Sequence, residues 1–342
     1  MRGHFLPALP VRGSASSGDY HDTTTFGYDS STPPPCKGHR DKLSSRNANM
    51  AHELYEPLNE YETVIVTNLV DPVSMSVAWS DIAGLDSVVS DLRDTVILPI
   101  QKCSVTQQSA LLQPPKGVLL FGPPGCGKTL MARATARESR CRFINLEPST
   151  LTDKWYGESQ KLTVALFSLA LKLQPMIIFI DEIDTFLRCR SSLDHAATAM
   201  MKAQSMVLWD GLTTDHGNTV VVFWATNRPQ EVDPAIVRRL PQCHHIPAPG
   251  VDQHLTINKL VLKDEDLDDD VSLSSVAMAT DGWAGSDLRP LCREAAVSRL
   301  RNHEDLMADD VSNLQPIGTK ELNFALNKMI ALQWATRDFS FY

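Results

Sequence analysis

The residues of this sequence that most clearly predict chemistry lie between Gly122 and Thr129, where the chain reads GPPGCGKT. The spacing G-x-x-x-x-G-K-[ST] is typical of a loop whose backbone N–H groups surround phosphate oxygens at the start of a helix. Lys128 would contact the β- and γ-phosphates, and Thr129 would ligate Mg²⁺. We therefore expect a nucleoside triphosphate site formed by Gly122, Pro123, Pro124, Gly125, Cys126, Gly127, Lys128, Thr129 and Leu130.

Two carboxylates, Asp181 and Glu182, directly follow an apolar run that begins at Ile177. On a buried parallel strand this order brings both carboxylates to the carboxyl edge of the sheet, where α/β proteins bind their ligands. We expect Asp181 to hold Mg²⁺ through water and Glu182 to polarise the attacking water. The alternative is a strand that ends in two solvated acids, but the position after the phosphate loop favours the catalytic reading. Asp184 is interpreted as structural.

The next apolar run ends in Ala-Thr-Asn, and Arg238 and Arg239 follow further along the chain. Asn227 would hydrogen-bond the γ-phosphate or the attacking water, unless it only forms an Asx turn. The two arginines would reach the γ-phosphate of a neighbouring subunit, since such trans-acting cations stabilise phosphoryl transfer. The alternative for them is a surface cation pair.

Lys154, Trp155, Tyr156 and Gly157 form the other notable segment. Two adjacent aromatic residues between polar residues are poor core material, so at least one must face outward. The functional interpretation is a loop that grips polypeptide through aromatic packing. The alternative is a surface turn with a half-buried tryptophan.

The elements that must position these residues alternate in type. Short apolar runs at 118–121, 143–146, 176–180 and 219–224 alternate with helical patterns, which predicts an α/β fold with a twisted parallel sheet covered on both faces. Helical spacing at 251–262, 271–279, 286–302 and 319–335 predicts a small all-helical lid domain. The expected domains are a disordered polar tail (1–50), a helical linker (51–78), a large ATPase domain (79–249) and the lid (250–342).

Composition excludes several classes of protein. The 342 residues carry a net charge of −9, which disfavours a nucleic-acid partner. The seven cysteines are widely spaced and include no C-x-x-C, so neither a disulfide framework nor a zinc site is expected. No run of about 20 apolar residues predicts a transmembrane helix.

Taken together, the motifs resemble an AAA ATPase of the meiotic clade. WSDIAG at 79–84, GPPGCGKT, KWYGES, IIFIDEID, ATNRP and GWAGSDL at 282–288 occur in the order and spacing of that family. TLTDKWYGESQKL and DHAATAMMKAQ are similar to Thorase and the mitochondrial outer-membrane AAA translocases. The likeness extends from about Asn59 to about Leu332.

The resemblance implies a homo-oligomer, a hexamer that hydrolyses ATP with Mg²⁺ and shares nucleotide sites across subunits. It implies extraction of mislocalised tail-anchored proteins from the mitochondrial outer membrane or the peroxisome, on the cytosolic side; the lack of a membrane helix also allows a cytosolic form. It places Ile82, Ala83 and Gly84 at the adenine and brings the lid residues Gly282, Ala284, Gly285 and Ser286 to the nucleotide. Trp155 and Tyr156 become the pore loop, with His195 in or near a second one.

Two departures from the family pattern keep other readings open. Cys243 stands where a second trans-acting arginine is usual, and Trp224 replaces a small residue that precedes Ala-Thr-Asn. Both favour a hydrolysis-poor subunit that scaffolds or inhibits active rings, and a bulky ring at 224 is expected to crowd the sheet. A microtubule-severing ATPase of the same clade is the other alternative. The tail, with six basic and four acidic residues, lacks the basic character and the added module that severing enzymes carry.

Overall fold

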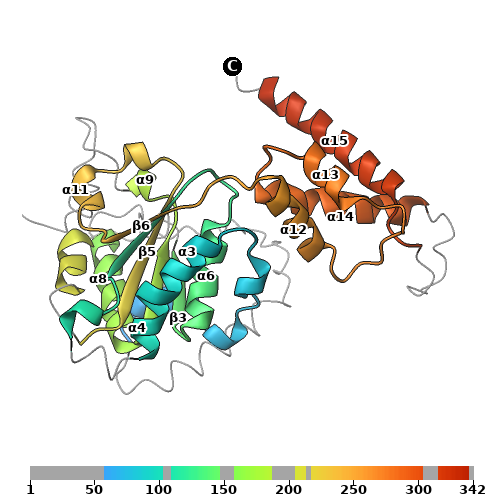
Figure 1. Cartoon of the computed structure of the whole chain (residues 1–342). Helices are drawn as coiled ribbons and strands as arrows, with labels where there is room; N and C mark the ends of the chain where they lie inside the picture. The colour runs from blue at the N-terminus through green and yellow to red at the C-terminus, as the bar shows by residue number, and fades with distance from the viewer. Residues whose placement is uncertain are drawn as a thin grey trace, which may run out of the picture. The chain divides into compact units, whose positions relative to one another are not determined.

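The structure, a computed structural model, describes residues 58–102, 109–146, 158–186, 205–212, 217–302 and 315–338. All of these belong to one compact unit. Within it, an α/β portion precedes a helical portion (Figure 1).

Six strands form one sheet in the order β1-β3-β4-β5-β2-β6. Their bounds are β1 (Leu69–Val70), β2 (Gly117–Phe121), β3 (Arg142–Leu146), β4 (Met176–Ile180), β5 (Val220–Thr226) and β6 (Gln242–His245). The four strands predicted from the sequence are confirmed, and they pair in parallel. Two short edge strands escaped prediction: β1 pairs antiparallel with β3, and β6 pairs parallel with β2.

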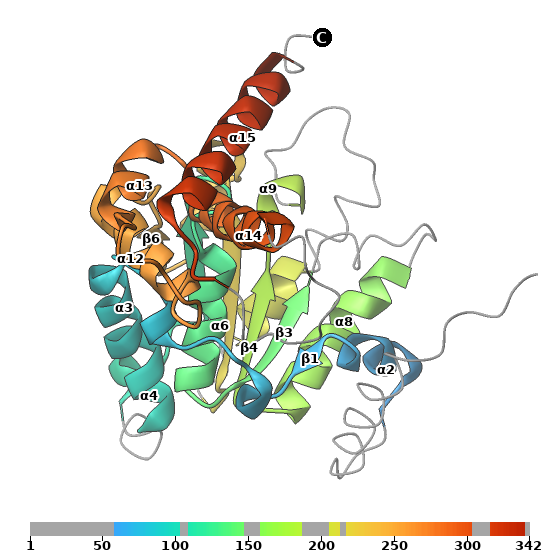
Figure 2. The ribbon, with the colours of Figure 1, turned by 90° about the vertical axis from the view of Figure 1, so that its right-hand side faces the viewer.

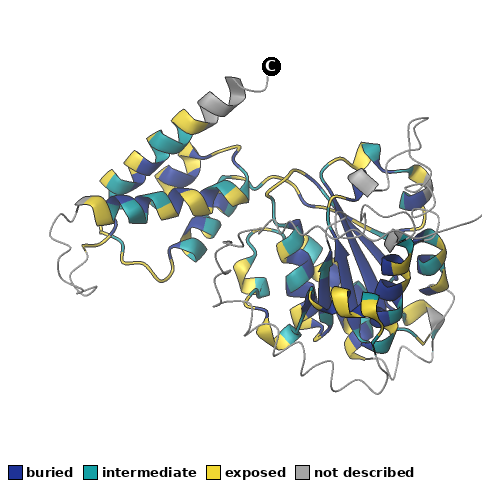
Figure 3. Ribbon diagram, turned by 180° about the vertical axis from the view of Figure 1, so that it is seen from behind, coloured by how far each residue is buried: buried dark blue, intermediate teal, exposed yellow. Residues whose placement is uncertain are grey.

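The helices of the α/β portion lie on both faces of the sheet (Figure 2). One face packs against α3 (Asp86–Leu92), α4 (Leu98–Gln101) and α6 (Lys128–Glu138), and the other against α2 (Glu60–Val66), α8 (Glu158–Lys172) and the helical residues 205–212. Successive residues of each strand contribute to opposite cores, so all five residues of β4 and all seven of β5 are buried (Figure 3). Such continuous burial follows from the period of two in a sheet covered on both sides.

Shorter elements complete this portion. Single turns of 3₁₀ helix are η1 (Pro72–Ser74), η2 (Trp79–Asp81), η4 (Ala110–Leu112) and η5 (Pro229–Glu231), and η3 (Arg93–Ile97) is a π-helical turn between α3 and α4. The helices α9 (Ile183–Phe186) and α11 (Pro234–Val237) each make about one turn. Helix α9 follows the end of β4, and α11 lies between the end of β5 and the start of β6.

The segment expected to be a helical linker also contributes strand β1 to the main sheet. Helix α2 is also held firmly: the carboxylate of Glu62 is fully buried and accepts hydrogen bonds from the Asn59 backbone, Ser168 and Lys172. Burial alone would raise the pKa of Glu62, but these partners outweigh it and lower the pKa. The described part of this segment, from residue 58 onward, is therefore an integral part of the α/β portion.

Trp224 does not crowd the sheet, contrary to the sequence expectation. Its ring is 1% exposed and packs edge-to-face on Trp209, with ring centroids 6.2 Å apart. It points to the core formed with α8, on the face opposite α6 and the phosphate loop. The aromatic pair fills this core, so the bulky residue does not disturb the loop.

Four helices form the helical portion: α12 (Val251–Val261), α13 (Leu273–Ala279), α14 (Gly285–Asn302) and α15 (Thr319–Asp338). They enclose a separate apolar core that includes Leu288, Leu291, Ala295 and Ile317. The four helices predicted from residue spacing are confirmed to within a few residues at each end. The exact domain bounds given above remain predictions.

Candidate nucleotide-binding site

The phosphate loop connects the end of β2 to the start of α6, where the sequence motif requires it. Gly127 is the N-cap of α6 and has a left-handed φ of +97°, which glycine adopts without steric cost. At Gly122 a Cβ atom would collide with the carbonyl oxygen of Ile246, so only glycine fits between the loop and the residue that follows β6. The loop therefore depends on these glycines for its shape.

Lys128 is 6% exposed, and its Nζ donates hydrogen bonds to the carbonyls of Gly122 at 3.0 Å and Pro123 at 2.8 Å. Burial lowers the pKa of its ammonium, and the nearby charge of Asp181 opposes that shift in part. A cation held among carbonyls in a partly desolvated place is suited to a polyphosphate, which would supply the missing negative charge.

Asp181 lies at the end of β4 and faces Thr129, whose Oγ1 donates to its Oδ2 at 3.2 Å. The other oxygen of Asp181 accepts from the backbone N–H of Glu182 at 2.9 Å. Glu182 has a φ of +50°, an unusual conformation for a residue other than glycine, and such conformations gather at functional sites. A hydroxyl and a carboxylate at this distance are oxygen donors of the kind Mg²⁺ uses together with phosphate oxygens and water.

Asn227 follows β5 and is positioned by a buried pair of residues. The hydroxyl of Thr226 is fully buried and donates to Oδ1 of Asp184 at 2.8 Å, and it accepts from the backbone N–H of Arg228 at 2.9 Å. Asp184, interpreted as structural from the sequence, thus links the segment that follows β4 to the last residue of β5, directly before Asn227. It also lies close enough to oppose the pKa shift of Lys128.

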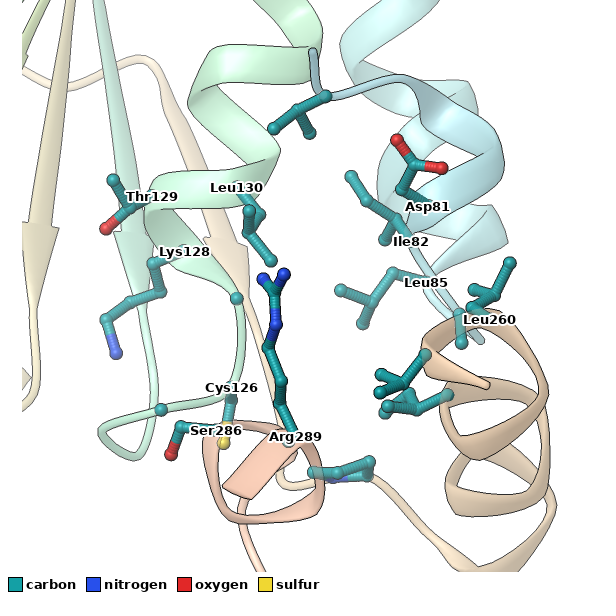
Figure 4. A pocket seen from close by; sticks show the side chains of 18 of the residues that line it. Asp81, Ile82, Leu85, Cys126, Lys128, Thr129, Leu130, Leu260, Ser286 and Arg289 are labelled. Carbon is teal, nitrogen blue, oxygen red and sulfur yellow. The ribbon is translucent and has the colours of Figure 1, made fainter. Parts of the chain in front are cut away.

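Lys128, Thr129, Asp181, Glu182 and Asn227 line one cavity of about 990 Å³. Figure 4 shows Lys128 and Thr129 on one side of it and Ile82, Leu85 and Leu260 on the other. The residues predicted from the sequence that line the cavity are Ile82, Ala83, Pro124, Gly125, Cys126, Gly127, Lys128, Thr129, Leu130, Asp181, Glu182, Asn227, Gly285 and Ser286. Lys128 and Thr129 thus lie across the cavity from the apolar side chains Ile82, Leu85 and Leu260, an arrangement that suits a nucleotide with its triphosphate and base.

Several predicted residues contribute without lining the cavity. The predicted residues Gly84, Gly122, Pro123, Gly282 and Ala284 are not among the residues that line it. The backbone of the lid turn is tied to the loop, since Ser286 N–H donates to the Gly125 carbonyl at 3.0 Å.

The trans-acting candidates lie elsewhere. Arg238 and Arg239 are exposed and are absent from the lining of the cavity. Arg239 pairs with Asp210 at 3.5 Å, and Cys243 is an exposed residue of the edge strand β6. Their role toward a second subunit remains a prediction.

Sequence reasoning missed part of the base side and two cations. Gln253, Ile257, Leu260 and Val261 of α12 line the cavity, as do Arg289 and Arg293 of α14. Their helical spacing was visible, but only the tertiary structure shows which face of each helix meets the cavity. Figure 4 shows Arg289 extending into the cavity from α14.

The aromatic-loop residues Lys154, Trp155, Tyr156 and Gly157, and also His195, lie outside the described residues. Within the described ranges, no helix has the length and apolar character needed to cross a membrane. Nor do the described His, Cys, Asp and Glu side chains gather in threes as a metal site.

Comparisons with known proteins agree with this geometry. Residues 118–248 match the family of ATPases associated with various cellular activities (AAA), and residues 270–313 match the AAA+ lid domain. The solved FIGL-1 AAA domain superposes with a TM-score of 0.68 at 32% identity, covering 84% of this chain and 98% of that one. A structure titled for katanin self-assembly gives 0.65 at 28% identity, covering 81% of this chain and 93% of that one. The fold and the site thus define an AAA ATPase with its lid.

More similar relatives narrow the assignment. Proteins named outer mitochondrial transmembrane helix translocase from Homo sapiens and Bos taurus are each 60% identical over 80% of this chain and 76% of their own length. The mitochondrial sorting homolog of Caenorhabditis elegans is 46% identical, with 84% of each chain covered. The chain belongs to the AAA ATPase family and, within it, to the group of these translocases.

Proposed function

We propose that this ATPase uses ATP hydrolysis to move transmembrane helices out of the mitochondrial outer membrane. The observation that carries the proposal is the 60% identity to relatives named for that activity; it is supported by a cavity that Lys128, Thr129, Asp181 and Glu182 line together. Its proposed substrates are mislocalised tail-anchored proteins, at the outer membrane or the peroxisome, and its proposed assembly is a hexameric ring.

In this proposal separate residues of the cavity bind Mg²⁺, bind the phosphates, activate water and contact the adenine. Thr129 and Asp181 hold Mg²⁺, which supplies charge neutralisation between the phosphates when bound. Lys128 exchanges its carbonyl partners for phosphate oxygens, Glu182 polarises the attacking water and Asn227 orients it. Ile82, Ala83 and Gly84 contact the adenine. Ser286 and its neighbours contact the nucleotide from the side of the lid.

Residues on the ring axis and at the contacts between subunits are proposed to couple ATP hydrolysis to movement of the substrate. Arg239, with Arg238, would complete the charge on the γ-phosphate of a neighbouring subunit. Lys154, Trp155, Tyr156 and Gly157, with His195 nearby, would grip the polypeptide.

The test is extraction in vitro. The full chain is added with ATP to liposomes that carry a tail-anchored reporter, and the released reporter is measured after flotation. We expect ATP-dependent release that Glu182→Gln abolishes and that Trp155→Ala abolishes while ATP hydrolysis stays within about threefold. Hydrolysis without release, accompanied by shortening of microtubules, would instead favour the alternative of a microtubule-severing ATPase.

A further inference from the structure

Gln253 connects the two walls of the base side of the cavity. Its Nε2 donates to the carbonyl oxygen of Gly84 at 2.7 Å, and its Oε1 accepts from the backbone N–H of Gly250 at 2.9 Å. Gly84 precedes α3, whereas Gly250 is the N-cap of α12. One side chain therefore joins segments that lie 169 residues apart in the sequence.

The backbone at Gly84 is shaped to receive this side chain. Gly84 has a left-handed φ of +69°, and a Cβ atom there would collide with the Cγ and the amide group of Gln253. A residue with a side chain would thus suffer both backbone strain and a clash. The close approach sets the path of the backbone from Ile82 to Leu85, two residues that line the cavity.

The same contact fixes the start of α12. Gln253 occupies the third position of that helix, and its hydrogen bond to the Gly250 N–H is one half of a capping box. The following turns carry Ile257, Leu260 and Val261 into the cavity. The distance between the two apolar walls, residues 82–85 and α12, therefore depends on the side-chain amide of Gln253. This amide donates a hydrogen bond to the first wall and accepts one from the second.

We propose that Gln253 is a positioning residue for base recognition, which holds the Ile82–Gly84 backbone at a fixed distance from α12 so that an adenine is accepted between them. The proposal rests on the assignment of this wall to the base in the proposed function. Gln253 acts through Gly84 and α12 and takes no part in phosphoryl transfer. Its loss must therefore change nucleotide affinity and base selectivity, while the chemical step is preserved.

Gln253→Glu separates the two hydrogen bonds. The carboxylate still accepts from Gly250 and suits a helix N-terminus, but it has no proton to donate and faces the Gly84 carbonyl oxygen. We expect the KM for ATP in the full chain to rise about tenfold, the scale of a lost hydrogen bond with an opposed oxygen, and kcat to stay within about twofold. Selectivity for ATP over GTP should fall at least about threefold, and a fluorescent ADP analogue should dissociate faster.

Matched variants make the result specific. Thr256→Ala changes an exposed residue of the same helix, whose hydroxyl donates only to the Asp252 carbonyl, and should leave KM and selectivity unchanged. Gln253→Ala should resemble Gln253→Glu with a smaller rise in KM. Gly84→Ala should also raise KM, and adding Gln253→Ala to it should cost less than the sum, because both changes break one contact.

Two outcomes would overturn the proposal. One is a KM and an ATP-to-GTP selectivity within twofold of the wild type in both Gln253 variants, with folding verified by circular dichroism. The other is a fall in kcat at unchanged KM, which would place Gln253 in the chemical step. Lys128→Ala distinguishes failure of the site itself: if that variant still binds nucleotide tightly, the assignment of the whole cavity is wrong, whereas silent Gln253 variants beside an inactive Lys128→Ala refute only the positioning role.

Discussion

The carboxyl ends of β2, β4 and β5 differ sharply from the adjacent edge strand β6. At these three of the four inner strands, hydrogen bonds of 2.8–3.2 Å fix Lys128, Asp181 and Thr226, and these side chains are buried or half-buried. At β6 and the turn before it, Arg238, Arg239 and Cys243 are exposed and do not line the cavity.

The difference shows which parts of catalysis one chain can provide. Inner strands are held on both sides, so their ends present Lys128, Asp181 and Thr226 in fixed positions within a single chain. An edge strand is hydrogen-bonded on one side only. The two arginines in the turn before β6 are exposed, and Arg239 pairs with Asp210 at the surface. We therefore expect changes at the inner ends to act in any assembly state and changes near β6 to act only between subunits.

Lys128→Ala should have the largest effect. It removes the cation nearest the phosphates, so we expect affinity for ATP to fall at least about a hundredfold, the scale of a lost charged hydrogen bond network. Hydrolysis should become undetectable. Titration of a fluorescent ATP analogue measures the affinity, and Lys259→Ala, which removes an exposed lysine on α12, is the control.

Glu182→Gln should keep ATP bound while hydrolysis falls at least about a hundredfold, the scale of a lost general base. The amide keeps the shape of the side chain but cannot polarise water. Size-exclusion chromatography with ATP should show an accumulated oligomer. Hydrolysis within threefold of the wild type would show that another group activates the water.

Cys243→Arg tests whether the edge strand β6 acts on the active site of a neighbouring subunit. A trans arginine contributes about 10³ to 10⁵ in rate where it has been measured, and Arg239 remains here, so we expect a gain of at least about tenfold. The gain should vanish at protein concentrations too low for assembly. An arginine that changes nothing in the assembled state would place position 243 outside the active site and leave Arg238 with Arg239 as the complete pair.

Thr226→Val should slow hydrolysis by about three- to tenfold with little change in KM. The valine is of similar size but cannot donate to Asp184 or accept from Arg228, so the backbone at Asn227 loses its support. Steady-state kinetics give the separation of kcat from KM. Thr226→Ser keeps the hydroxyl and should retain most of the rate; equal losses in both variants would point to packing.

His244→Phe should have the smallest effect, on stability. His244 is 7% exposed, its Nε2 has no partner among the described residues, and burial lowers its pKa although Asp91 opposes the shift. Since the folded state disfavours the proton, stability is fully present above about pH 6.5 and is lost as the pH falls below it. The lowered pKa also means that His244 does not replace the missing arginine near that pH.

We therefore expect His244→Phe to raise Tm at pH 5.5 more than at pH 7.5; the difference is at most about 1.4 kcal/mol, because pH 5.5 lies about one unit below the unfolded pKa and one unit corresponds to about 1.4 kcal/mol. His245→Phe changes an exposed neighbour and should show no such difference. A Tm shift that is the same at both pH values would mean that packing, and not protonation, limits stability at this position.

The sequence by itself determined the phosphate loop, the carboxylates Asp181 and Glu182, and the four inner strands. Each of these is a local pattern: the glycine spacing, the apolar run and the polar residue that ends it are contiguous, so their geometry follows from the strand and the helix that contain them. It also determined the four helices of the lid, because their apolar spacing repeats within each helix.

Only the tertiary structure decided the contacts between distant segments. The strands β1 and β6 are too short for a pattern and form because a neighbouring strand offers hydrogen-bonding groups. Asp184 meets Thr226 across 42 residues, and Gln253 meets Gly84 across 169. No local preference encodes such pairs, since each depends on where packing of the whole sheet and the start of α12 bring the two chain segments together.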